Sequence, residues 1–149
     1  MEITRHFTAT TFIVNEQHLL LHLHKKLGLW LPVGGHIDRD ELPEQAARRE
    51  IKEESGLEVN FFNPDQPITM NDAKQLIRPM HIILENINPF HQHIDFIYYA
   101  TSLSNQVNPT SGETTNLKWL TATEIKALQN APGNVTVLGL EALALLSNF

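Results

Sequence analysis

The sequence predicts a layered protein of the α/β or α+β class, in which helices pack on a mixed β-sheet. Three observations lead to this prediction: several runs rich in β-forming residues, a helix-forming segment near residue 50, and further helical segments near the end of the chain. The 149 residues show no internal repeat and no long linker. We therefore expect one domain that spans residues 1–149.

The first expected strands form a hairpin, because residues 6–15 and 18–26 are β-forming runs separated by the dipeptide EQ. Residues 29–37 predict short extended pieces, broken by a proline and a glycine pair. The polar, proline-rich segment 63–79 predicts a loop with room for a short helical piece. Further strands are expected over residues 57–62, 80–87, 91–103 and 117–120.

Three helices are expected. The first covers residues 43–55, because Pro43 suits a first helical turn and Gly56 suits the position where a helix stops. The second begins at Thr121, whose spacing to Glu124 is that of a capping box. The third covers residues 134–149, despite the β-branched residues at its start.

Composition and charge exclude several classes of protein. No stretch approaches the roughly 18 apolar residues of a membrane span, and the N-terminus resembles a strand more than a signal peptide. A net charge of −6 disfavours nonspecific binding to nucleic acid or to an anionic membrane. The sequence has no cysteine, which suits a reducing compartment. We expect a cytoplasmic protein, and the net charge does not exclude small phosphorylated ligands, which need only a local site.

The central helix concentrates acidic side chains on one face. At 100° per residue, Glu53 and Glu54 lie within about 60° of Glu50 around the helix axis. Ala46 and Ala47 share this face one turn earlier, and we expect them to leave space above the carboxylates. The opposite side is expected to face solvent and carries Arg48, Lys52 and Ser55.

Three carboxylates within one helical turn repel each other unless they are protonated or bridged by a cation. A hard divalent cation such as Mg²⁺ accepts these oxygen ligands. Zn²⁺ fits less well, since the chain has no thiolate and no histidine shares this helical face. Taken without its surroundings, the cluster could equally be a solvated acidic surface.

The residues around the acids favour the metal site. From Gly35 the sequence has five residues, Glu41, seven residues, Arg49-Glu50, an apolar residue, one residue, Glu53-Glu54, one residue, and Gly56 followed by an apolar residue. This pattern resembles the Nudix (MutT-like) hydrolase signature at every specified position. The resemblance implies an α/β/α sandwich with a mixed sheet, in which residues 35–57 form a loop-helix-loop.

The resemblance also implies roles for individual residues. Glu50, Glu53 and Glu54 match the metal-binding carboxylates, and the Gly34 carbonyl is expected to add a ligand. The family uses Mg²⁺, or Mn²⁺ in its place. Arg49 is expected to orient the glutamates through an ion pair with an acid, either Glu53 or the signature acid Glu41. Gly35 and Gly56 are expected to have backbone roles.

The catalytic base has two candidates. Glu53 lies among the expected metal ligands. Glu113 lies in the loop 108–116, where some Nudix enzymes place an additional glutamate. A loop acid can equally be an ordinary solvated residue, so both possibilities stay open.

Other polar residues carry weaker signals. His22 with His24, and His91 with His93, are spaced to share one face of a strand. No third ligand stands at a sequence spacing typical of a metal site, so we interpret both pairs as half-exposed strand residues rather than metal ligands. The candidates for substrate binding are Arg78, His93 and Asp95.

The sequence therefore predicts a Mg²⁺-dependent hydrolase that cleaves the diphosphate linkage of a small nucleotide or nucleoside diphosphate derivative. Ala73 stands where many ADP-ribose hydrolases have a proline, and residues 74 and 75 lack the tyrosine of dinucleoside polyphosphate hydrolases. Nucleoside triphosphate pyrophosphohydrolase is favoured over nucleotide-sugar hydrolase because the chain is short. The alternative functions are a noncatalytic nucleotide sensor and an RNA-processing enzyme. The sequence leaves open whether the protein is a monomer or a homodimer.

Overall fold

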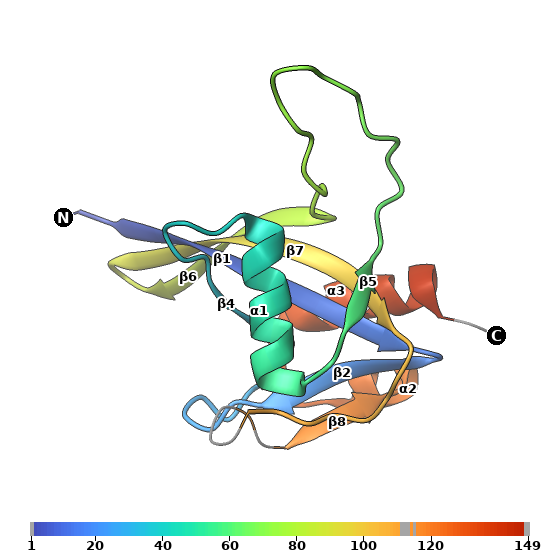
Figure 1. The fold of residues 1–149 in the computed structure, drawn as a ribbon. Coiled ribbons are helices and arrows are strands. Elements are labelled where there is room, and N and C mark those ends of the chain that lie inside the picture. The colour runs from blue at the N-terminus through green and yellow to red at the C-terminus, as the bar shows by residue number, and fades with distance from the viewer. Residues whose placement is uncertain (1, 111–113, 115, 148–149) are drawn as a thin grey trace.

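The computed structural model describes residues 2–110, 114 and 116–147. The chain forms strands and helices in the order β1 (Thr4–Asn15), β2 (His18–Leu23), β3 (Trp30–Leu31), β4 (Val33–His36), α1 (Pro43–Ser55), β5 (Val59–Phe61), β6 (His81–Asn88), β7 (His91–Ser102), β8 (Leu117–Leu120), α2 (Ala122–Ala127) and α3 (Gly133–Leu146). The predicted elements are confirmed, although the strand expected over 18–26 ends at Leu23. The segment 63–79 contains no helix and projects away from the sheet (Figure 1).

The strands join one mixed sheet built around β1. This strand pairs in parallel with β7 along most of its length, and in antiparallel fashion with β4 and β2 at different parts of its other edge. The hairpin of β1 and β2 has the expected two-residue turn, with Glu16 in the left-handed conformation. Strand β6 pairs with β7, and so does β5, whereas β3 and β8 pair with β2.

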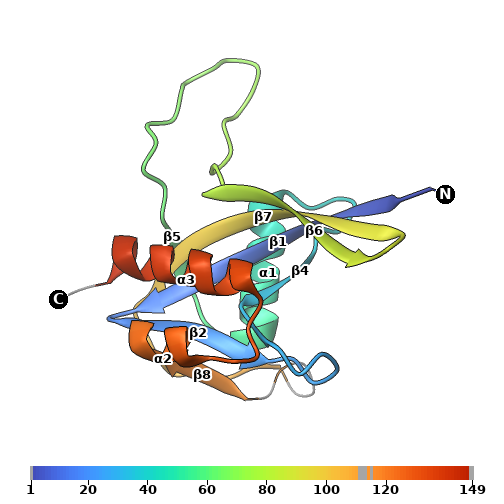
Figure 2. The same cartoon turned by 180° about the vertical axis from the view of Figure 1, so that it is seen from behind.

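Helices cover both faces of the sheet, as expected for an α/β/α sandwich (Figures 1 and 2). Side chains alternate along a strand, so Phe12 and Ile13 of β1 enter two different cores. Phe12 packs in the core that includes Val135 and Leu138 of α3. Ile13 packs with Ile51 of α1. No helix within the described residues is long and apolar enough to cross a membrane.

The helix α1 lies close to the sheet because its buried side chains are small. Ala46 and Ala47 pack against Ala9 and Tyr98. The expectation that the alanines leave space above the carboxylates was wrong, because they fill the contact between helix and sheet. The expected solvent exposure of Ser55 was also wrong: this residue is fully buried, and its hydroxyl donates to the Ile51 carbonyl at 2.6 Å.

Candidate active site

The acidic face of α1 lies along the outer edge of β4, the edge that does not pair with β1. The Gly34 N–H donates to Glu54 Oε1 at 2.9 Å, and Arg49 Nη2 donates to the His36 carbonyl at 3.0 Å. In a β-strand the N–H and C=O of one residue point to the same side. The Gly34 carbonyl therefore lies on the same edge as the Glu54 carboxylate, where it was expected as a metal ligand.

Glycine at position 35 leaves the space that Glu50 occupies. A Cβ atom built on Gly35 would lie 2.3 Å from Glu50 Oε1 and 2.6 Å from Glu50 Cδ. Any side chain there would push the carboxylate away from β4. This close approach gives a physical reason for the backbone role that the sequence pattern implied for Gly35.

Arg49 binds several of the acids at once. Its Nε and Nη2 each lie 2.8 Å from an oxygen of Glu41, which makes a two-pronged ion pair. Its Nη1 donates to Glu50 Oε1 at 2.8 Å and lies 3.7 Å from Glu53 Oε2. The guanidinium thus makes both of the ion pairs considered from the sequence, and it also holds the Glu50 carboxylate in place.

The pair between Arg49 and Glu41 predicts a pH-dependent stability. Hydrogen bonds from Arg49 lower the pKa of Glu41 from 4.5 to about 2. A carboxylate whose pKa is lower in the folded state stabilises the protein above its ordinary pKa, and this stabilisation is lost as pH falls through about 2.

Replacing Glu41 with glutamine should therefore lower the free energy of unfolding at pH 7 by on the order of 1 kcal/mol, a figure reduced for solvent screening. Urea unfolding of both proteins at pH 7, 4 and 3 would measure this difference. We expect the two curves to converge as the pH falls. A difference that stayed constant over this range would contradict the assigned ion pair.

The three glutamates differ in exposure. The side chains of Glu50 and Glu54 are 16% and 12% exposed, whereas that of Glu53 is 40% exposed. Burial raises the pKa of Glu50, and the negative charge of Glu53 adds to this effect, although Arg49 opposes it. The three glutamates outnumber the single Arg49 that contacts Glu50 and Glu53, and the potential ligands on α1 are carboxylate oxygens, which is the chemistry that fits Mg²⁺ or Mn²⁺.

A pocket of about 280 Å³ lies beside Glu54. It is lined by His22, Leu23, His24, Lys25, Lys26, Glu54 and Thr114. His22 Nε2 lies 3.6 Å from Glu54 Oε2. His22 was expected to be half-exposed, but it is only 7% exposed, and burial lowers its pKa. His24 lies beyond the end of β2.

The other predicted site residues lie elsewhere or outside the described residues. Glu113 falls outside them, although its neighbour Thr114 lines the pocket beside Glu54. Arg78 belongs to the projecting loop, where its Nη2 donates to Asp65 Oδ1 at 2.7 Å. His93 and Asp95 alternate with the residues of β7 that face α1, so they lie on the opposite face of the sheet.

Asp95 is part of a polar cluster on that opposite face. It is 4% exposed and accepts hydrogen bonds from the Thr10 hydroxyl at 2.8 and 2.9 Å. Burial raises the pKa of Asp95, and burial together with Asp95 raises the pKa of Glu85 to about 8. Asp95 and Arg78 therefore bind other residues of the protein, Thr10 and Asp65, and neither contacts the acids of α1 in these hydrogen bonds.

The comparison with protein families agrees with the signature. Residues 4–138 match the model of the NUDIX domain. The chain belongs to the Nudix family. A crystal structure of a NUDIX-family hydrolase from Clostridium perfringens is 44% identical in sequence and has a TM-score of 0.86, with 97% of this chain and 100% of that chain covered. This chain is a Nudix hydrolase.

More distant structures share the Nudix fold. A MutT NUDIX hydrolase from Burkholderia pseudomallei is 19% identical, with a TM-score of 0.69 over 93% of this chain and 98% of that chain. An Ap4A hydrolase from C. elegans is 21% identical, with a TM-score of 0.72 over 97% of this chain and 99% of that chain. At these identities the likeness concerns the fold alone.

Proposed function

We propose that this Nudix hydrolase is a Mg²⁺-dependent nucleoside triphosphate pyrophosphohydrolase, which Mn²⁺ can also support. The observation that carries this proposal is the position of the acids. Glu54 and Glu50 lie close to Gly34 and Gly35 of β4, Glu53 lies near Arg49, and Lys25 and Lys26 line the pocket beside Glu54. The same pocket is thus lined by a carboxylate that can bind a cation, Glu54, and by two lysines that can bind a phosphate chain. Cleavage of a nucleotide sugar is the second candidate.

In this proposal Glu50, Glu53, Glu54 and the Gly34 carbonyl hold the cation. When bound, the cation neutralises charge on the phosphate oxygens and lowers the pKa of a coordinated water. Arg49 keeps the Glu50 carboxylate turned toward β4, so the ligands are already positioned before substrate binds. Glu53 has the most exposed carboxylate of the three and can accept a proton from the attacking water. Glu113 stays the second candidate for this base.

The residues that line the pocket support a triphosphate substrate. Lys25 and Lys26 are exposed and come directly after His24 in the sequence. Two ammonium groups beside the metal-binding acids would attract the terminal phosphates of a nucleotide. A nucleotide sugar carries only a diphosphate and gains less from this charge. The substrates named for structural relatives range from a UDP-X compound to Ap4A, and they do not decide between these classes.

Replacing both Lys25 and Lys26 with alanine should raise the KM for a nucleoside triphosphate about tenfold and change kcat less, because the lysines bind the ground state as well as the transition state. Steady-state kinetics at saturating Mg²⁺ would measure both constants. Lys126→Ala, which removes an exposed lysine from α2, is the matched control. An unchanged KM in the double variant would show that the phosphate chain binds elsewhere.

The reaction itself is tested by the products released from nucleoside triphosphates, nucleotide sugars, ADP-ribose and dinucleoside polyphosphates, each with Mg²⁺ or with a chelator. We expect pyrophosphate and mononucleotide from triphosphates, only when Mg²⁺ is present. Release of sugar phosphate instead would establish the second candidate. Binding of nucleotides without turnover would establish the noncatalytic sensor.

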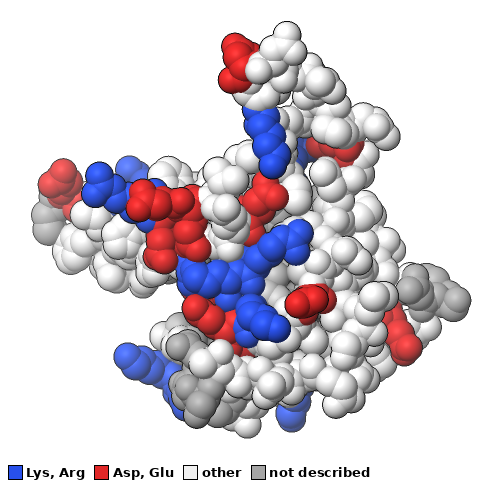
Figure 3. Space-filling model, viewed as in Figure 1, with Lys and Arg blue, Asp and Glu red and all other residues white. Residues whose placement is uncertain are grey.

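Two further features support a small nucleotide substrate over RNA. The net charge is −6, and Figure 3 shows positive and negative side chains interspersed over the face that carries α1. A 5′-end RNA-processing enzyme needs a continuous basic surface to follow the nucleic acid backbone. Hydrolysis of 5′-triphosphorylated RNA in preference to free nucleotides would overturn this choice. We propose the cytoplasm as the location, since the cysteine-free chain suits a reducing compartment.

A further inference from the structure

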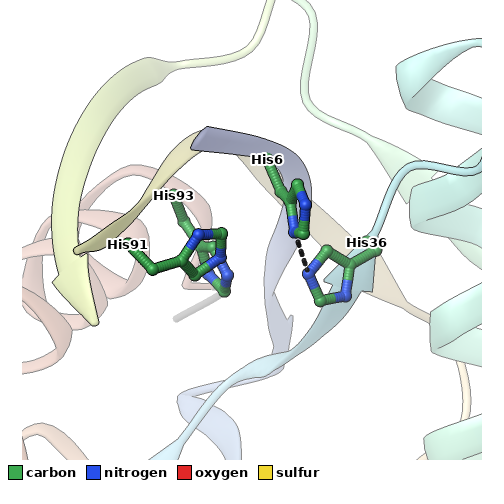
Figure 4. A group of neighbouring side chains, drawn as sticks. All are labelled: His6, His36, His91 and His93. Carbon is green, nitrogen blue, oxygen red and sulfur yellow. Dashed lines mark hydrogen bonds between the residues drawn. The ribbon is translucent and has the colours of Figure 1, made fainter. Parts of the chain in front are cut away.

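Four histidines from three strands converge on the sheet face opposite α1 (Figure 4). His6 of β1 lies beside His93 of β7 in the parallel register, and His91 comes two residues before His93 on the same face. His36 of β4 pairs with Thr8, which comes two residues after His6 on β1. The register of three strands therefore brings together side chains that are far apart in the sequence.

The ring nitrogens have the spacing of a metal site that needs little adjustment. One ring nitrogen of each histidine lies within 4.8 Å of those of the other three. His6 Nδ1 and His36 Nε2 are 3.3 Å apart. Tetrahedral zinc with Zn–N bonds of about 2.0–2.1 Å separates its nitrogens by roughly 3.4 Å. One edge of the tetrahedron thus already has this length, and the exposed or half-buried rings can turn to shorten the others.

The contacts of His91 leave one ring nitrogen available for a metal ion. Its Nδ1 lies 3.1 Å from the Thr4 carbonyl oxygen and 2.9 Å from the Thr4 hydroxyl, which itself donates to the Phe90 carbonyl. A carbonyl oxygen only accepts, so Nδ1 carries the proton and Nε2 has the free lone pair. Metal-bound histidines commonly have this arrangement, in which the second nitrogen donates to a backbone carbonyl.

We propose that His6, His36, His91 and His93 bind one divalent transition-metal ion, for which Zn²⁺ is the best match. Imidazole nitrogens suit Zn²⁺, Ni²⁺ and Cu²⁺ but not the hard Mg²⁺ ion. The carboxylates of α1 lie at the outer edge of β4, whereas the four imidazole rings lie on the sheet face opposite α1. The two sites therefore use different ligand atoms, although the His36 carbonyl accepts a hydrogen bond from Arg49. A bound ion would link the N-terminal end of β1 to β4 and β7, as a crosslink between strand ends.

The binding test uses the full chain without a histidine tag, treated with chelator and then dialysed against Zn²⁺ in millimolar Mg²⁺, which occupies the carboxylates. We expect one Zn²⁺ per chain. At a hundredfold excess over Kd, Zn²⁺ should raise the melting temperature by about 5–10 °C, because the ion binds only the folded state. His6→Gln and His91→Gln should each weaken binding at least tenfold, whereas His18→Gln, outside the cluster, should not.

Two controls locate the ion. Glu54→Gln should keep the full Zn²⁺ stoichiometry, and Co²⁺ in place of Zn²⁺ should give the strong visible absorption of a tetrahedral site. Metal-free melting curves of the histidine variants, compared with wild type, separate ligand loss from misfolding. Unchanged binding in a His6→Gln, His91→Gln double variant, loss of binding in Glu54→Gln, or a weak octahedral Co²⁺ spectrum would each overturn the proposal.

Discussion

Glu54→Gln should lower kcat for Mg²⁺-dependent hydrolysis by at least about a hundredfold, because it removes a negative charge from the proposed cation site. The Glu54 carboxylate is nearly buried and accepts the Gly34 N–H at 2.9 Å. A glutamine oxygen can keep this hydrogen bond, so the fold should survive. Stability in chelator should stay equal or rise, since fewer like charges then share the face of α1.

Steady-state kinetics and thermal melting would measure the two effects of this substitution. Glu58→Gln is the matched control, because Glu58 is an exposed acid just beyond the end of α1. Glu53→Gln should also lose activity by orders of magnitude, whether Glu53 acts as a metal ligand or as the base. A Glu54→Gln enzyme with wild-type turnover would contradict the metal assignment.

Gly56→Ala should lower the free energy of unfolding by about 2–4 kcal/mol, with two causes that add. Gly56 ends α1 in the left-handed conformation, with a φ of 73°. A Cβ atom there would lie 2.3 Å from the Asn108 carbonyl oxygen, which belongs to rigid backbone rather than to a flexible side chain. Urea unfolding at pH 7 would measure the loss of stability.

Gly28→Ala separates the two causes. Gly28 also has a positive φ, of 64°, but no atom lies within 4 Å of the Cβ that alanine would add. This substitution should cost only about 1 kcal/mol, the conformational part of the effect. Equal losses at the two positions would show that the contact with Asn108 contributes nothing.

The contact at Gly56 also concerns the candidate active site. The Asn108 N–H donates to the Ser55 carbonyl, and the Thr110 N–H donates to the Glu53 carbonyl, each at 2.8 Å. These two hydrogen bonds hold residues 108–110, which precede Glu113 in the sequence, against the C-terminal end of α1. Gly56 therefore allows the close approach between the signature helix and the loop that carries the second candidate base.

The sequence by itself determined the features that depend on local spacing. The three acids share one face of α1 because positions three and four residues apart are neighbours on any helix. The proline at the start of α1 and the left-handed Gly56 at its end follow from backbone preferences of single residues. The pair of Arg49 with Glu41 also followed from the signature, because it lies within one loop-helix unit.

Only the tertiary structure decided the features that depend on strand register. His91 and His93 alone gave no sign of the proposed metal site, because the other two histidines are 55 or more residues away and come from β1 and β4. The burial of His22 beside Glu54 required the packing of α1 on the sheet. Sequence periodicity indicates which residues share one face of a helix or strand. Pairing between distant strands decides which of these faces meet, and no local pattern encodes that register.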